Sequence, residues 1–266
     1  MGDLKELRVL RGFIFDMDGV IYRGHEVVPG APEFIANLRV AAIPFVYLTN
    51  NSTTPPDKVA ARLADMGIPA TANEVLTSAE VTAAEVSRAV KGRRALLIGE
   101  EGIRTALIRS GFSLVENHRE ADVVVVGIDR QTTYARLREA ALAIRRGAPF
   151  YATNTDSTLP TEAGLVPGAG AIVGFLEIAT DVHPVVFGKP SPDVFWHALR
   201  ALGTEATATA IIGDRTDTDI LGGQRAGVRT IAVLSGADTA DDFAAMQPPP
   251  DWVFPGLAEL NQAYFG

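Results

Sequence analysis

Short apolar runs alternate with longer amphipathic stretches along most of this chain. The runs predict strands over residues 12–16, 44–49, 94–98, 121–126, 149–153, 185–187, 209–213, 229–233 and 252–254. Between them, apolar residues recur at the i, i+3, i+4 spacing of amphipathic helices over residues 31–40, 55–66, 79–90, 132–146, 192–202 and 218–226. Strands that alternate with helices in this way are typical of βαβ units, so the pattern predicts an α/β fold built on a parallel sheet.

Composition narrows the class of protein. The chain has 266 residues and 47% hydrophobic content, enough for one large domain or two medium ones. A net charge of -8, with the basic residues scattered, argues against a nucleic-acid partner. Cysteine is absent and the four histidines lack zinc spacing, so any metal should be a hard, oxygen-bound ion. We expect a cytoplasmic protein with no membrane partner, because the sequence shows neither a signal peptide nor an apolar membrane span.

Two carboxylates follow the first predicted strand directly. Asp16 and Asp18 would point to the same face if the chain stays extended, and could then address one magnesium ion or one phosphate. The dipeptide Asp18-Gly19 is also a strong signal for a tight turn. The pair alone does not decide between a turn and a site for phosphoryl chemistry.

Polar groups also follow two other predicted strands. Thr49 and Asn50 offer a hydroxyl and backbone N–H groups that can hold phosphate oxygens, although this composition also suits an ordinary loop. Lys189, in the run Gly188-Lys189-Pro190, offers an ammonium that can neutralise a phosphoryl group, although a lone lysine is usually solvated.

A fourth strand runs into three acids within six residues, Asp214, Asp217 and Asp219. Like charges this close repel one another unless a cation lies among them. The alternative is a helix start, where an acid favours the helix dipole, and Asp217 in particular fits that alternative. In an open parallel sheet the carboxyl ends of strands converge on one crevice, so the four segments together favour phosphoryl chemistry.

The ordered motifs Asp-x-Asp-Gly, Thr-Asn-Asn-Ser, Gly-Lys-Pro and Gly-Asp-x-x-x-Thr-Asp-Ile resemble the haloacid dehalogenase-like (HAD) superfamily of phosphatases, over nearly the whole chain. Residues 125–129, 133–137, 152–154 and 167–171 narrow the resemblance to subfamily IIA. That branch includes 4-nitrophenylphosphatases and phosphoglycolate, pyridoxal-phosphate and nucleotide phosphatases. The resemblance implies a Rossmann-like core with an inserted α/β cap, and a magnesium-dependent phosphatase that acts on a small phosphomonoester.

The resemblance also assigns roles to the acids. Asp16 is expected to attack phosphorus and become an aspartyl phosphate, and Asp18 to act as general acid and base. The carboxylates of Asp16 and Asp214, with the backbone carbonyl of Asp18, would hold Mg²⁺. Asp219 would not bind the ion directly and would instead orient bound waters or Lys189.

The remaining roles concern the phosphate. Thr49, the N–H of Asn50 and Lys189 would bind it and cancel its charge, because an anionic carboxylate must approach an anionic monoester.

Thr49 and Lys189 lie 140 positions apart, far more than a crossover connection needs. We therefore expect a second α/β domain between them, with residues 79–182 as the cap and residues 1–78 and 183–266 as the core. By resemblance the cap confers substrate specificity through a loop that contains Asn154 and Asp156 and reaches Pro160. The resemblance also suggests a homodimer formed through the cap.

Residues 168–174, Gly-Ala-Gly-Ala-Ile-Val-Gly, faintly resemble a dinucleotide-binding loop. That fingerprint follows a strand directly, whereas the nearest predicted strand ends at Thr153. We therefore expect these glycines to serve helix–sheet packing.

The predicted cap loop departs from the branch at Thr155, where proline is common, and no Arg or Lys lies between Asn154 and Glu177. We therefore expect a small substrate with a single phosphate, or broad tolerance. A phosphomutase, or a non-catalytic phosphate-ligand-binding protein on the same fold, remains an alternative. A dehalogenase is disfavoured, since it needs neither Asp18 nor a magnesium site. The sequence leaves open the physiological substrate, the oligomeric state and the resting position of the cap.

Overall fold

The computed structural model describes residues 3–161 and 163–266. Residues 1, 2 and 162, which the predicted domain ranges include, lie outside the described residues. The chain divides into two compact units. The core unit comprises the chain through Thr49, Asp57–Leu76 and Lys189–Gly266, and the inserted unit comprises Asn50–Pro56 and Thr77–Gly188.

A six-stranded sheet in the order β15-β14-β13-β1-β4-β5 forms the centre of the core unit. Its strands are β1 (Gly12–Phe15), β4 (Phe45–Thr49), β5 (Val75–Thr77), β13 (Thr209–Gly213), β14 (Arg229–Val233) and β15 (Trp252–Phe254). The pairings from β15 through β4 are all parallel. The chain adds strands in one direction from β1 and later in the other from β13, so the strand order reverses between these two. Open α/β sheets bind ligands outside the carboxyl ends of the strands at such a reversal.

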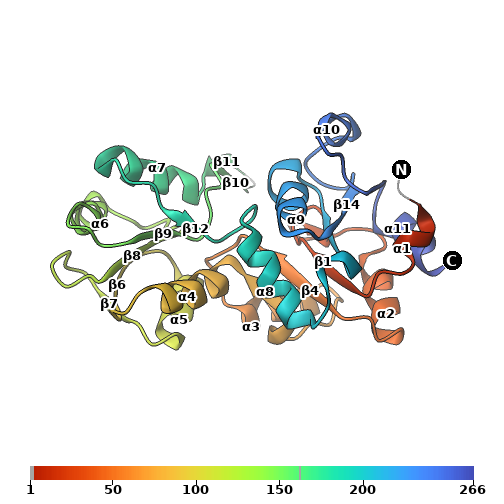
Figure 1. Cartoon of the computed structure of the whole chain (residues 1–266), viewed down its shortest axis with the longest axis horizontal. Coiled ribbons are helices and arrows are strands. Elements are labelled where there is room, and N and C mark those ends of the chain that lie inside the picture. Colours follow the sequence, from red (N-terminus) through yellow and green to blue (C-terminus); the bar gives the residue numbers. More distant parts are fainter. Residues whose placement is uncertain (1–2, 162) are drawn as a thin grey trace. The chain divides into compact units, whose positions relative to one another are not determined.

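Helices cover this sheet, and the first and last of them contact each other beside it (Figure 1). The helices are α1 (Leu4–Leu7), α2 (Ala31–Val40), α3 (Pro56–Asp65), α8 (Pro192–Leu202), α9 (Leu221–Ala226), α10 (Ala240–Ala245) and α11 (Leu257–Phe265). On one face Phe13 of β1 meets Phe34 of α2 and Tyr264 of α11 edge to face, with ring centroids 5.6 and 5.1 Å apart. These buried rings pack β1 against both helices.

The inserted unit has its own parallel sheet, in the order β12-β9-β8-β6-β7. Its strands are β6 (Arg94–Ile98), β7 (Ser113–Val115), β8 (Val123–Val126), β9 (Phe150–Ala152) and β12 (Val185–Val186). Figure 1 shows α6 (Tyr134–Arg145) and α7 (Ala169–Thr180) on one side of this sheet and α4 (Ser78–Ala89) and α5 (Glu101–Arg109) on the other. The predicted α/β class is therefore confirmed.

Two antiparallel hairpins complete the strands. They are β2 (Tyr22–Arg23) with β3 (Glu26–Val27), and β10 (Thr158–Thr161) with β11 (Gly164–Pro167). Short 3₁₀ turns cover Ala72–Glu74 and Ala206–Ala208. Within residues 3–161 and 163–266, no helix is long and apolar enough to cross a membrane.

Two local predictions are wrong. The segment predicted as a helix over residues 218–226 begins as a π-helical turn, Thr216–Ile220, before α9 takes over. The wider turn brings Asp219 to accept a hydrogen bond from the backbone N–H of Arg215 at 3.2 Å, and such turns recur at functional sites.

The second error concerns Gly168. A strand, β11, does end immediately before it, although its partner β10 is antiparallel and no βαβ unit is formed. These glycines let the backbone of a loop, rather than a sheet, pack close to the start of α7. A Cβ at Gly168 would lie 2.2 Å from the Asp156 carbonyl oxygen, and one at Gly170 would lie 2.3 Å from the Thr155 carbonyl oxygen.

Candidate active site

Three acids come together where the core strand order reverses. Asp16 follows β1 and Asp214 follows β13, and these strands pair in register with Phe15 opposite Ile212. One carboxylate oxygen from each of Asp16, Asp214 and Asp219 lies within 4.8 Å of the others. All three residues are buried, so the cluster is a concentrated negative charge inside the protein.

Lys189 lies among these acids and is 4% exposed. Its ammonium donates to Asp219 Oδ1 at 2.7 Å and to Asp16 Oδ1. Two carboxylates therefore pair with this ammonium while Asp214 lies within 4.8 Å of both, so the three acids outnumber the ammonium. Buried charge of one sign is costly unless a further cation offsets it.

Burial dominates the titration of these groups. It raises the pKa of Asp16 to about 6, with Lys189 opposing the shift and Asp214 adding to it. Burial also raises the pKa values of Asp214 and Asp219. Burial alone would lower the pKa of Lys189, yet the carboxylates of Asp16 and Asp219 raise it, so this side chain stays an ammonium.

Two glycines shape the surroundings of Asp214. A Cβ at Gly19 would lie 2.2 Å from Asp214 Oδ2, and one at Gly236 would lie 1.9 Å from the same atom. Asp214 Oδ2 accepts from the backbone N–H of Ala237 at 2.7 Å. The other oxygen, Oδ1, is buried without a hydrogen-bond partner among residues 3–161 and 163–266. A buried carboxylate oxygen without a donor keeps acceptor capacity, and carboxylate oxygens are ligands that hard cations prefer.

Asp18 lies at the start of a turn and is exposed. Gly19 has φ +82°, and its N–H donates to the Tyr22 carbonyl at 2.8 Å. The turn and the phosphoryl-site interpretations of Asp16 and Asp18 are therefore compatible. Partial desolvation by the surrounding protein raises the pKa of Asp18. The positive charges of Arg62 and, to a smaller extent, Lys189 oppose this shift.

Thr49 is buried as the last residue of β4 in the core unit, and Asn50 is the first residue of the inserted unit. The Asn50 carbonyl accepts from Asn154 Nδ2 at 2.8 Å and from Ser78 Oγ at 2.7 Å. Its side-chain amide donates to Asp156 Oδ2 at 3.2 Å. The two residues predicted for substrate specificity, Asn154 and Asp156, therefore lie against the predicted phosphate-binding residue Asn50.

Comparison with known proteins gives consistent matches. Residues 13–113 match the model of a haloacid dehalogenase-like hydrolase family, and residues 186–260 match a HAD-hydrolase-like family. An acid sugar phosphatase of Staphylococcus aureus is 39% identical over 253 residues, which cover 95% of this chain and 97% of that protein. The chain belongs to the haloacid dehalogenase-like hydrolases.

Solved structures of this family agree in fold. A 4-nitrophenylphosphatase from Thermotoga maritima is 33% identical, with a TM-score of 0.91 over 97% of this chain and 99% of that one. A glycerol phosphate phosphatase from Mycobacterium tuberculosis, solved in complex with magnesium, is 34% identical, with a TM-score of 0.91 over 97% of this chain and 78% of that one. The matches place the chain among the subfamily IIA phosphatases, as a phosphoric monoester hydrolase with a Rossmann-like HAD core.

Sequence reasoning missed two parts of the site. Arg62 of α3 stacks on the Tyr22 ring, 4.6 Å from its centroid, and donates to the Gly24 carbonyl at 2.6 Å. The segment after β14 donates to Asp214 through Ala237, and Ser235 Oγ donates to the Gly19 carbonyl at 2.7 Å. This second segment could have been anticipated, because β14 ends at the same edge of the parallel sheet as β1 and β13.

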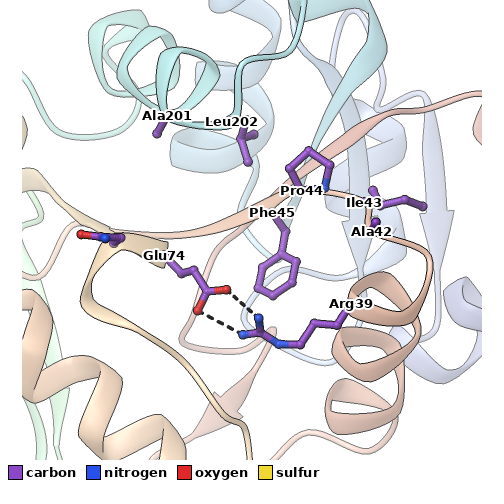
Figure 2. A pocket seen from close by; sticks show the side chains of 9 residues that line it. Arg39, Ala42, Ile43, Pro44, Phe45, Glu74, Ala201 and Leu202 are labelled. Carbon is purple, nitrogen blue, oxygen red and sulfur yellow. Dashed lines mark hydrogen bonds and ion pairs between the residues drawn. The ribbon is translucent and has the colours of Figure 1, made fainter.

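A pocket of about 400 Å³ lies at the amino end of β4, whereas the acidic cluster lies at the carboxyl ends of the core strands (Figure 2). Its charged lining residues neutralise each other: Arg39 pairs with Glu74 at 2.8 Å and lies over the Phe45 ring, 4.9 Å from the centroid. The pocket therefore lacks the excess charge that distinguishes the cluster around Lys189.

Proposed function

We propose that this phosphatase hydrolyses small phosphomonoesters through an aspartyl-phosphate intermediate on Asp16, with Mg²⁺ held in the acidic cluster. The observation that carries the proposal is the buried set of Asp16, Asp214 and Asp219 around Lys189, at the reversal of the core strand order. Relatives of this chain are an acid sugar phosphatase, a 4-nitrophenylphosphatase and a glycerol phosphate phosphatase. Their names support a small phosphorylated substrate.

The residues present fit a divalent cation. Asp214 Oδ1 is a buried oxygen without a protein donor among the described residues, and the cluster carries more carboxylates than Lys189 can neutralise. Asp16, Asp214 and the backbone carbonyl of Asp18 would hold the ion, with Asp219 supporting Lys189. Once bound, Mg²⁺ would reduce the repulsion between the Asp16 carboxylate and the phosphate oxygens.

The chain's own groups account for both chemical steps. The Asp16 carboxylate attacks phosphorus, the bond from phosphorus to the ester oxygen breaks, and Asp18 gives its proton to the departing alcohol. Asp18 then takes a proton from water, whose oxygen attacks the phosphorus of the aspartyl phosphate and releases inorganic phosphate and Asp16. Lys189, the Thr49 hydroxyl and the Asn50 N–H would hold the phosphoryl oxygens throughout.

The inserted unit is proposed as the cap that confers substrate specificity. Its loop at Asn154 and Asp156 offers a carboxylate and no basic side chain before Glu177, which would repel a second anionic group. A single phosphate on a small alcohol is the substrate class that this loop favours.

The test is release of 4-nitrophenol from 4-nitrophenyl phosphate, with and without EDTA, for the parent protein and two variants. Asp16→Asn should lose turnover completely while its melting curve stays cooperative. Asp217→Asn is the matched control, because this acid sits in the same loop as Asp214 but is exposed and paired with Arg215. It should keep near-normal rates. Near-normal turnover by Asp16→Asn, or EDTA-resistant turnover by the parent protein, would overturn the proposal.

A further inference from the structure

Asn50, Asn154 and Asp156 form a closed ring of hydrogen bonds within the inserted unit. Asn154 Nδ2 donates to the Asn50 carbonyl at 2.8 Å, and the Asp156 N–H donates to Asn154 Oδ1 at 3.1 Å. The Asn50 amide closes the ring by donating to the Asp156 carboxylate at 3.2 Å. Each member is held by the other two, so none can move without breaking a bond.

The hydrogen-bonding groups of the Asn154 side chain are engaged within this ring. It is 5% exposed, and Nδ2 also approaches Thr153 Oγ1 at 3.4 Å. An amide offers two donor hydrogens and one oxygen, and the ring and Thr153 engage both the nitrogen and the oxygen. Such a side chain has little capacity left to contact a substrate, in contrast to the role expected from sequence.

Asn50 is fixed from both sides by this arrangement. Its carbonyl accepts from Asn154 and from Ser78, and its side chain is held by Asp156. The residue before it, Thr49, is the end of β4. The Asn50 N–H therefore lies between a fully buried strand and a residue held by three hydrogen bonds. A donor that is positioned in advance loses little entropy when it binds an anion.

We propose that Asn154 is a positioning residue, which orients Asn50 for phosphate binding and ties it to the specificity loop at Asp156. This inference rests on the proposed function, because it assigns Asn154 a task within the same phosphatase site. Asp156 has the complementary role. Its side chain is half-buried, and its carboxylate can accept hydrogen bonds beyond the one from Asn50. Asp156 is therefore the ring member that can bind substrate hydroxyl groups and so discriminate between substrates.

The two roles predict different kinetics on a panel of monophosphates and bisphosphates. Asn154→Asp keeps the shape but removes the donor to the Asn50 carbonyl. It should lower kcat/KM about 10- to 100-fold, by a similar factor for every substrate, and weaken competitive inhibition by inorganic phosphate. Ser78→Ala, which removes the second donor to that carbonyl, should change both quantities in the same direction by a smaller factor. Asp156→Asn should instead change the order of preference among substrates.

Asn117→Ala is the matched control, because it removes an exposed asparagine of the same unit that only supports a local turn. It should leave all these values unchanged. A changed substrate order for Asn154→Asp, or unchanged inhibition by phosphate, would overturn the inference while the parent protein's turnover still supports a phosphatase. If Asn154→Asp does not fold, Ser78→Ala decides: unchanged phosphate inhibition in that variant overturns the inference. A parent protein without metal-dependent turnover would instead overturn the proposed function.

Discussion

Both units place acids just beyond the carboxyl ends of parallel strands, but they treat those acids differently. In the inserted unit Asp129 follows β8 and pairs with Arg136, whose guanidinium also donates to the Leu97 carbonyl at 3.0 Å. Glu100 follows β6 and accepts from both the backbone and the guanidinium of Arg130. Each acid there has a basic partner of its own.

In the core unit, by contrast, Asp16 and Asp219 share Lys189, and Asp214 lies within 4.8 Å of their carboxylates. The consequence is visible in opposite pKa shifts. Hydrogen bonds from Arg130 lower the pKa of Glu100, whereas burial raises the pKa values of the three core acids. Acids therefore follow strand ends in both sheets, and the ratio of acids to basic partners separates the two ion pairs of the inserted unit from the core cluster proposed to bind a cation.

The largest expected difference between the units comes from removing their cations. Lys189→Met should lower the free energy of unfolding by about 3–5 kcal/mol, because buried carboxylates lose their ammonium. It should also lower kcat/KM by about 10²–10³-fold. Arg130→Met should cost only about 1 kcal/mol, since the side chains of Arg130 and its partner Glu100 are 64% and 22% exposed, and should leave turnover intact. Urea unfolding and 4-nitrophenyl phosphate kinetics measure both. Equal losses of turnover in the two variants would contradict the comparison.

The next effect should come from adding magnesium. Folding raises the pKa values of Asp16, Asp214 and Asp219 above 3.8, so the folded chain holds protons that the unfolded chain has released. Stability without metal should therefore fall as pH rises from about 4 to about 7 and then level off. Mg²⁺ needs the ionised acids, so saturating MgCl₂ should stabilise by about 2–3 kcal/mol at pH 8 and clearly less at pH 5. Thermal melts measure this, and equal shifts at both pH values would contradict it.

A smaller effect should come from neutralising one core acid. Asp214→Asn should raise the stability of the metal-free protein at pH 8 by about 1 kcal/mol, because the folded state disfavours the charged form of this carboxyl group. The same variant should lose both turnover and the stabilisation by Mg²⁺. Differential scanning calorimetry with and without MgCl₂ separates these outcomes. A destabilised variant that still responds to Mg²⁺ would show that Asp214 is an ordinary structural acid.

The smallest effect should come from neutralising an acid in the inserted unit. Glu100→Gln should lower stability at pH 7 by about 0.5 kcal/mol, since Arg130 is largely exposed. Folding lowers the pKa of Glu100 below 4.5, so its contribution is present above that pH and should disappear as the pH falls. Turnover should stay within twofold of the parent value. A chemical denaturation series from pH 7 to pH 3 measures this sign, which is opposite to that of Asp214→Asn.

Local patterns predicted much of the fold. The helix predicted over residues 192–202 is α8, with proline at its start and Gly203 at φ +67° after its end. The fully buried strands β1, β4 and β13 also lie where their apolar runs predicted them. These elements carry strong signals of their own, namely continuous apolar runs and end caps.

What sequence reasoning missed depends on contacts distant in the chain. Helix α5 was not predicted, and two N–H groups of its first turn, those of Gly102 and Ile103, donate to the carbonyls of Thr53 and Ser52, about fifty residues earlier. Likewise the excess of acids around Lys189 follows from the motifs, whereas the ring through Asn154 requires two loops to meet. Motif order predicted which groups carry charge, and tertiary packing determines which of them are already satisfied.

Helices α1 and α11 bear on how the two units are connected. Arg8 Nε donates to the Ala263 carbonyl at 2.9 Å and Tyr264 Oη donates to the Leu10 carbonyl at 2.8 Å, so α1 and α11 are fastened together in the core unit. The inserted unit, by contrast, consists of two segments, Asn50–Pro56 and Thr77–Gly188, and each is joined to the core unit at both of its ends. Any replacement of this unit must therefore rebuild four junctions with the core.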